Sequence, residues 1–123
     1  MSKLLIVDNS THLLEAMKRI LERLGYTIKT LDRIDIIYEE IRKFQPDLII
    51  LDIYLSGEDG REICKKLKIN FETKHLPVIL FSAFSKELED YKSYLADDFI
   101  EKPFDIKTLV DKIKSVLNCG TAP

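Results

Sequence analysis

The sequence predicts an α/β domain with a parallel sheet covered by helices on both faces. Short runs of aliphatic residues alternate along the chain with segments of helical periodicity. This alternation occurs five times within 123 residues. A closed barrel of alternating strands and helices needs about twice this length. The predicted architecture is therefore an open, doubly wound, five-stranded parallel sheet with right-handed crossovers.

Five segments are predicted to be strands. Four of them are short, apolar and rich in Ile, Val and Leu, as buried parallel strands are. The second segment along the chain instead alternates in polarity, which suits the edge of a sheet. In chain order the five are Leu4–Val7, Tyr26–Thr30, Leu48–Leu51, Val78–Phe81 and Phe99–Ile100.

Helical segments lie between the predicted strands. Apolar residues recur at steps of three and four positions in the first and last of these segments, which is the period of an amphipathic helix. The predicted helices cover residues 13–24, 35–44, 60–69, 86–95 and 106–117. Residues that commonly end or cap helices stand at the expected places: Gly25, Asp59, Ser85 and Asp105.

Composition excludes several classes of function. Lys and Arg number 19 against 21 Asp and Glu, so the chain lacks the basic balance of a nucleic-acid-binding protein. Apolar runs do not exceed four residues, which excludes a membrane span and the apolar core of a secretory signal. We therefore expect a cytoplasmic protein, in which Cys64 and Cys119 stay reduced. From the length we expect one domain over residues 1–119, followed by a disordered tail at 120–123.

Polar residues stand where the predicted strands end. Asp8 with Asn9, Asp52, Ser82 and Lys102 each follow a different strand. Each one alone has a purely structural explanation, such as capping a helix or starting a turn. Together they are expected to meet, because ligands of open parallel sheets bind beyond the carboxyl ends of the strands.

This set of residue types is suited to phosphoryl chemistry. Two carboxylates and an amide supply the oxygen ligands that Mg²⁺ prefers. An Asp can attack a phosphoryl group and hold it as an acyl phosphate. The charge on the transferred group is stabilised by a metal ion, an ammonium and a hydroxyl donor, and Lys102 and Ser82 supply the last two.

Several motifs together resemble the receiver domain of two-component response regulators, the superfamily that includes the chemotaxis receivers. They are the segments 4–10 (LLIVDNS), 46–52 (PDLIILD), 82–83 (SA) and 96–104 (ADDFIEKPF), with Gly60. The resemblance extends over residues 3 to about 117. It implies a flavodoxin-like receiver fold with strand order 2-1-3-4-5.

The resemblance also implies roles for the strand-end residues. Asp52 corresponds to the phosphoacceptor, and Lys102 and Ser82 to the groups that bind the phosphoryl oxygens. The Mg²⁺ ligands would be Asp8, Asn9, Asp52 and the backbone carbonyl of Tyr54. Most relatives carry two acids where this chain has Asp8 and Asn9, so we expect weakened Mg²⁺ binding.

Further positions follow from the same resemblance. Ser82 and Phe99 would be the switch residues, and the Lys102–Pro103 peptide bond would be cis. Tyr54 and Phe84 lie two positions beyond Asp52 and Ser82, where the family tunes the lifetime of the phosphoryl group. Their rings are expected either to exclude water from the acyl phosphate or to pack outward.

The segment from Ser82 to Lys102 is about two residues shorter than in many relatives, so we expect an altered fourth helix or exit loop. This segment forms the usual output face of the family. Lys65, Lys66 and Lys68 are interpreted as a solvated helix face, and His12 as a surface residue.

The leading functional hypothesis is a phosphoacceptor that is loaded by a sensor histidine kinase or a phosphotransfer protein and signals to a downstream protein. As a monomer or weak dimer, it would catalyse only its own phosphorylation and dephosphorylation. The alternative is a degenerate receiver that binds partners without phosphorylation, because Asn9 removes one acid. A haloacid-dehalogenase-like phosphatase would need an Asp at the position of Tyr54, and a flavin binder would need a Gly-rich loop after the first strand.

Overall fold

A five-stranded parallel sheet forms the centre of the computed structural model, which describes residues 2–55 and 57–119. The strand order is β2-β1-β3-β6-β7, which confirms the predicted order of 2-1-3-4-5. The edge position of β2 agrees with its alternating polarity. The strands are β1 (Lys3–Val7), β2 (Thr27–Leu31), β3 (Leu48–Asp52), β6 (Val78–Ser82) and β7 (Asp98–Glu101).

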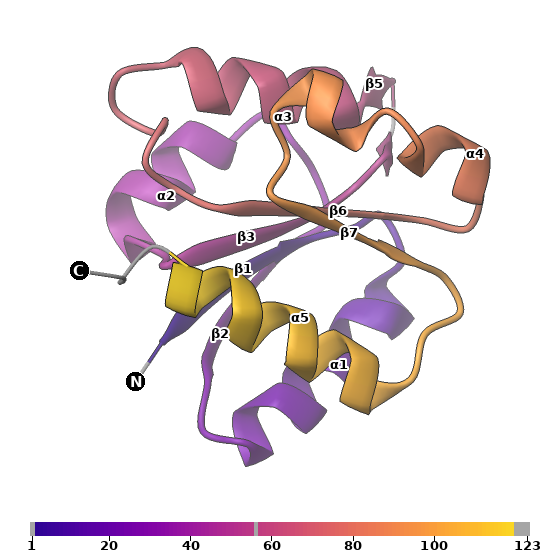
Figure 1. Ribbon diagram of the computed structural model, residues 1–123. Coiled ribbons are helices and arrows are strands. Elements are labelled where there is room, and N and C mark those ends of the chain that lie inside the picture. The colour runs from indigo at the N-terminus through magenta and orange to yellow at the C-terminus, as the bar shows by residue number, and fades with distance from the viewer. Residues whose placement is uncertain (1, 56, 120–123) are drawn as a thin grey trace.

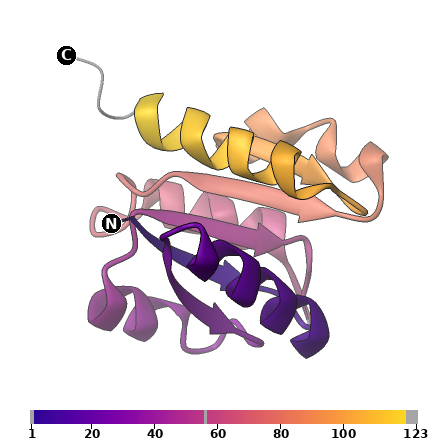
Figure 2. The same ribbon diagram turned by 90° about the horizontal axis from the view of Figure 1, so that it is seen from below.

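Helices cover both faces of this sheet, as the doubly wound fold class requires (Figure 1). Helices α1 and α5 lie on one face, and α2, α3 and α4 lie on the other. Figure 2 shows the face that α1 and α5 cover. The helices are α1 (Thr11–Arg23), α2 (Ile37–Phe44), α3 (Gly60–Ile69), α4 (Ser85–Leu88) and α5 (Ile106–Cys119), with a short 3₁₀ helix, η1 (Tyr91–Tyr94).

The sheet separates two apolar layers. Alternate residues of each strand point to opposite faces, so Ile79 packs with α1 and α5, whereas Leu80 packs with α2 and α3. Both side chains are fully buried. Because β1, β3 and β6 are buried on both faces, they consist almost entirely of aliphatic residues.

A small hairpin follows the central strand. Strands β4 (Tyr54–Leu55) and β5 (Glu58–Asp59) pair antiparallel and lead into α3. The Asp59 carboxylate accepts a hydrogen bond from the Arg61 backbone N–H, so Asp59 caps α3 as predicted. The hairpin extends the loop at the carboxyl end of β3, where the functional residues are expected.

One capping prediction is wrong, and one cap was not predicted. Helix α1 is capped by Ser10, whose hydroxyl accepts from the Leu13 backbone N–H. The predicted cap Ser85 is the first residue of α4, and the N-cap position is taken by Phe84, which makes no side-chain capping hydrogen bond. At α5 the prediction agrees, because the Asp105 carboxylate accepts from the Thr108 backbone N–H.

The predicted helix over 86–95 is also wrong in detail. The segment divides into the four-residue α4 and the 3₁₀ turn η1, and Leu95 then adopts a left-handed backbone conformation with φ of 64°. The reason is tertiary: Asp97 is tied to the first residue of β6, because its N–H donates to the Val78 carbonyl and its carboxylate accepts from the Val78 N–H. The chain must therefore reach this point in an orientation that a regular helix does not give. The segment in which we expect an alteration relative to the family is thus a short helix followed by a 3₁₀ turn.

Within residues 2–55 and 57–119, no helix has the length and apolar character that a membrane span requires. Cys64 is buried and unpaired, and burial raises the pKa of its thiol to about 12, so it is an unreactive core residue. The side chain of Cys119 and the expected tail at 120–123 lie outside the described residues.

Candidate functional site

Four polar side chains gather at the carboxyl edge of the sheet. Asp8 follows β1, Asp52 ends β3, Ser82 ends β6 and Lys102 follows β7. The strands are parallel, so their carboxyl ends share one edge. Asp8 and Ser82 are 0% exposed and Asp52 is 3% exposed, which is rare for such groups unless they are paired.

The ammonium of Lys102 lies between the two carboxylates. Its Nζ is 2.8 Å from Asp8 Oδ2 and 3.6 Å from Asp52 Oδ2. The same Nζ stands 4.5 Å from the centre of the Phe81 ring, a favourable cation–π distance. The Lys102 backbone N–H donates to the Ser82 carbonyl at 2.8 Å, and the Lys102–Pro103 bond is cis, as the resemblance implied. Lys102 is thus fixed at both its backbone and its side chain.

Two buried acids share this one cation, and the electrostatics of Asp52 reflect it. Burial raises the pKa of Asp52, the nearby charge of Asp8 raises it too, and Lys102 partly opposes both effects, so that the pKa stands at about 6. At neutral pH the Asp52 carboxylate is therefore ionised but destabilised. A group of this kind in a polar cluster is a candidate nucleophile.

The other oxygen of Asp52 is held by the backbone that follows it. Asp52 Oδ1 accepts a hydrogen bond from the Tyr54 N–H at 3.3 Å. The loop then returns to the strand, because the Gly60 N–H donates to the Ile53 carbonyl at 2.7 Å. A Cβ at position 60 would stand 1.9 Å from the Asp52 carbonyl oxygen, so only glycine fits here.

The Ser82 hydroxyl is engaged away from the Lys102 cluster. It donates to Glu87 Oε1 at 3.1 Å and accepts from the Phe84 N–H at 3.1 Å. Glu87 also accepts a short hydrogen bond from the Tyr54 hydroxyl. The structure therefore joins Asp8, Asp52 and Lys102 by direct contacts, whereas Ser82 is bound by a residue of α4.

Aromatic residues surround the carboxyl edge. The Tyr54 and Phe84 rings meet edge to face at 5.8 Å, and they remain 51% and 58% exposed. Phe99 is half-buried on β7, where its ring lies 4.8 Å from Tyr91 and under the ammonium of Lys112 at 4.4 Å. Phe99 is thus packed against η1, at the part of the fold that departs from a regular helix.

The donor set fits a divalent cation, although with one acid fewer than the resemblance would supply. Asp8 and Asp52 repel each other, and a bound cation would relieve the repulsion that raises the pKa of Asp52. Asn9 is exposed beside Asp8 and offers a neutral carbonyl oxygen. Within the described part of the chain, no three or more His, Cys, Asp or Glu side chains converge as a metal site. The resemblance would place a further acid at the position of Asn9.

Glu87 is the residue that sequence reasoning missed. An acid five positions after Ser82 matches no motif, and its contact depends on how α4 begins. The missed cap Ser10 had a signal, because a Ser three positions before Leu13 fits the N-cap pattern.

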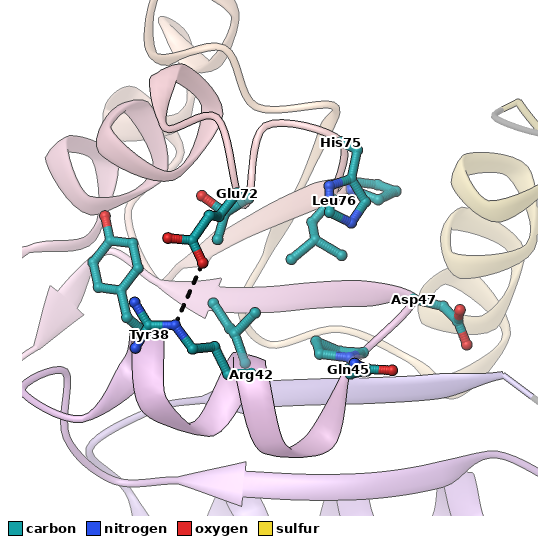
Figure 3. A pocket seen from close by; sticks show the side chains of 11 residues that line it. Tyr38, Arg42, Gln45, Asp47, Glu72, His75 and Leu76 are labelled. Atoms are coloured by element: carbon teal, nitrogen blue, oxygen red, sulfur yellow. Dashed lines mark hydrogen bonds and ion pairs between the residues drawn. The ribbon is translucent and has the colours of Figure 1, made fainter.

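A second concave region lies at the opposite edge of the sheet. This cavity of about 590 Å³ opens between α2 and the loop that precedes β6 (Figure 3). An exposed ion pair between Arg42 and Glu72, at 3.4 Å, spans it. The chemistry-bearing cluster is at the other edge, so this cavity is not the site that the sequence predicts.

The fold and site define a class: small doubly wound α/β proteins with buried aspartates and a lysine at the carboxyl edge of a parallel sheet. The family model of the response regulator receiver domain matches residues 4–114. The chain therefore belongs to the response regulator receiver domain family, the receiver module of two-component signal transduction.

Solved structures agree with this assignment. A two-component response regulator from Clostridium difficile is 26% identical, with a TM-score of 0.86 over 96% of this chain and 97% of that one. TrrA from Thermotoga maritima, solved in complex with Mg²⁺-BeF, is 29% identical, with a TM-score of 0.84 over 94% and 99%. NtrX from Brucella abortus is 27% identical, with a TM-score of 0.87 over 98% of this chain but 27% of NtrX.

Proposed function

We propose that this chain is an active phosphoacceptor in which Asp52 receives a phosphoryl group from a phosphohistidine. One observation carries the proposal: the buried Asp52 carboxylate lies 3.6 Å from Lys102 Nζ and beside a second buried acid, Asp8. A histidine kinase partner follows from the receiver family. A histidine phosphotransfer protein offers the same phosphohistidine and is an equivalent donor.

The transfer needs few groups from the protein. An ionised Asp52 oxygen attacks phosphorus, the new O–P bond forms, and the P–N bond to the donor imidazole breaks, leaving an imidazole that takes a proton from solvent. Lys102 balances negative charge on the phosphoryl oxygens. Hydrolysis of the acyl phosphate by water returns Asp52 and inorganic phosphate. No separate metabolic substrate is required.

Asp8, Asn9, Asp52 and the Tyr54 carbonyl would hold Mg²⁺. When bound, the ion supplies positive charge that neutralises the phosphoryl oxygens during transfer. The Mg²⁺-BeF complex of TrrA supports this assignment by similarity. With Asn9 in place of an acid, we expect a functional but weaker metal site.

Phosphorylation would change the surface that β6 and β7 form with α4 and η1. Ser82 would turn to the phosphoryl group, and Phe99 would adjust its packing against Tyr91 of η1. Because a four-residue α4 and the 3₁₀ turn η1 stand in place of one regular helix, we expect the downstream protein to recognise a surface that differs from that of other receivers.

The Tyr54 and Phe84 rings are proposed to slow hydrolysis by limiting the access of water. Their edge-to-face contact forms one aromatic surface near Asp52 and Ser82. The variants Tyr54→Asn and Phe84→Glu should lose phosphate several times faster, measured after removal of the phosphodonor. An unchanged lifetime of the phosphoryl group in these variants would mean that the rings do not shield it and instead pack outward.

The decisive experiment is intact-mass spectrometry after incubation with Mg²⁺ and acetyl phosphate. We expect the wild type to gain the mass of one phosphoryl group, and Asp52→Asn to gain none. Lys102→Ala should load much more slowly, because it loses the only cation in contact with Asp52 among the described residues.

The degenerate receiver remains the second candidate, and one observation favours it. The described residues provide only two converging carboxylates at this edge, Asp8 and Asp52. A wild type that stays unmodified in this assay, while a control receiver is loaded in the same tube, would establish this alternative.

A further inference from the structure

Glu87 has no part in the proposed transfer, yet it contacts two residues that do. Its carboxylate accepts hydrogen bonds from the Ser82 hydroxyl and from the Tyr54 hydroxyl. It therefore links the end of β6 and the hairpin strand β4 to α4. Glu87 is only partly exposed, and its neighbour Leu88 is 1% exposed and fixes this turn against the core.

The Ser82 hydroxyl is fully committed in this arrangement. Its single hydrogen points to Glu87, and its oxygen accepts from the Phe84 N–H. A hydroxyl has one hydrogen to donate. Ser82 can thus donate to Glu87 or to a phosphoryl oxygen on Asp52, but not to both.

The charge of Glu87 strengthens its hold on the Ser82 hydroxyl, because hydrogen bonds to an ionised acceptor are stronger than neutral ones. Arg61 is a cation near Glu87, but its guanidinium is bound to Asp59 at 2.8 Å and stacked 5.3 Å from the Tyr94 ring. Glu87 therefore keeps its charge available for the Ser82 and Tyr54 hydroxyls.

We propose that Glu87 is a positioning residue that holds Ser82 and Tyr54 in the unphosphorylated arrangement and opposes loading of Asp52. This inference rests on the proposed function. Loading breaks the Ser82–Glu87 hydrogen bond, which leaves Glu87 of the four-residue helix α4 bound to the Tyr54 hydroxyl alone. The output segment is thereby coupled to the phosphoacceptor through one carboxylate.

The test compares Glu87→Ala and Glu87→Gln with the wild type. Glu89→Gln is the matched control, since it removes the same charge from an exposed residue two positions away. Loading by acetyl phosphate with Mg²⁺ is followed by intact mass, and thermal unfolding of each variant checks the fold. The NMR resonance of the Phe84 amide in the unloaded protein reports the position of the Ser82 hydroxyl, because this N–H donates to it.

We expect Glu87→Ala to load about fivefold faster than the wild type, the effect of losing one partly exposed charge-assisted hydrogen bond. Glu87→Gln should load at an intermediate rate, because it keeps an acceptor oxygen but not the charge. The Phe84 amide should shift in Glu87→Ala and stay close to the wild-type position in Glu87→Gln. Glu89→Gln should match the wild type in both measurements.

Two outcomes overturn this inference while leaving the proposed function intact. One is that Glu87→Ala loads at the wild-type rate. The other is that Glu89→Gln accelerates loading equally, which would make the effect one of general surface charge. If neither the wild type nor any variant is loaded, the proposed function itself fails, and the role of Glu87 fails with it.

Discussion

Asp52 is a residue whose ionisation the fold opposes. Its pKa is raised to about 6, so the folded protein holds this proton more tightly than the unfolded chain does. The protonated Asp52 carboxyl therefore stabilises the folded protein below about pH 4, and this contribution is lost as the pH rises through about 6. The rise in the pKa of Asp52 corresponds to about 3 kcal/mol in the free energy of unfolding.

The variant Asp52→Asn should remove this dependence. Without metal ions, we expect it to be more stable than the wild type at pH 7 by about 1–3 kcal/mol, because Lys102 keeps Asp8 and the repulsion between the two acids disappears. The two proteins should converge in stability near pH 4. Urea denaturation in EDTA between pH 4 and pH 7 measures the difference.

The exposed Asp90→Asn variant serves as the control and should follow the wild-type profile. An Asp52→Asn protein that is less stable than the wild type at pH 7 would show that the Asp52–Lys102 ion pair outweighs the burial of the carboxylate.

Asn9 is predicted to limit metal affinity. The variant Asn9→Asp supplies a third carboxylate, so Mg²⁺ should bind about tenfold more tightly. Isothermal calorimetry suits this measurement, because the chain has no Trp to act as a fluorescent reporter. The control Gln45→Glu adds the same charge at the opposite edge of the sheet and should leave the affinity unchanged.

At this scale, sequence predicts the residues that sit at strand ends and not the contacts that depend on side-chain geometry. Asp8, Asp52 and Lys102 could be placed together because parallel strands end at one edge. The contact between Glu87 and Ser82 could not, because it depends on the start of a four-residue helix that has no distinctive pattern. Local hydrogen bonds of this kind are decided by the tertiary path of the chain.

Among the elements, the junction between β3 and α3 depends on the space available at Gly60. The variant Gly60→Ala would place a methyl group against the backbone of Asp52, so the junction must move. We expect a loss of about 2–4 kcal/mol in unfolding free energy, together with slower phosphorylation. Chemical denaturation and the intact-mass assay measure the two effects.

Gly57 provides the comparison. A Cβ there meets nothing within 4 Å, but the backbone has φ of +77°, so Gly57→Ala should cost only about 1 kcal/mol, through conformational strain. If Gly60→Ala and Gly57→Ala lost the same unfolding free energy, the backbone around position 60 would be able to move and accommodate a methyl group without further cost.

The elements also show where sequence patterns fail. Lys68 was expected to belong to a solvated helix face, yet its ammonium binds Asp97 at 2.8 Å and the Leu76 carbonyl at 3.0 Å. The contact joins α3 to the segment before β7, a pairing that helical periodicity does not encode. The same anchoring of Asp97 accounts for the broken helix after Ser85, because tertiary contacts override local propensity.

For the whole molecule, β6 contributes residues to both apolar layers, so we expect the two layers to unfold as one cooperative unit. Ile79→Ala and Leu80→Ala remove buried side chains from opposite layers, and each should cost about 2–5 kcal/mol. Both variants should still unfold in a single transition, with circular dichroism and tyrosine fluorescence coincident in urea. Separate transitions would show that the layers are independent.

The overall architecture was the most predictable feature. Alternation of aliphatic runs with helical stripes requires a covered parallel sheet, and right-handed crossovers leave few arrangements. The order of the strands came from the resemblance and is confirmed by the register of β1 between β2 and β3. Local patterns do not carry strand order, because every buried strand has nearly the same composition.

The ion pair between Lys102 and Asp8 spans 94 positions of the chain. During synthesis Asp8 emerges early, whereas Lys102 emerges only after the last strand. A nascent or truncated chain that ends before Lys102 would thus carry Asp8 and Asp52 without the cation that contacts both. If Asp52 accepts a phosphoryl group as proposed, such an incomplete chain would be loaded much more slowly than the finished protein.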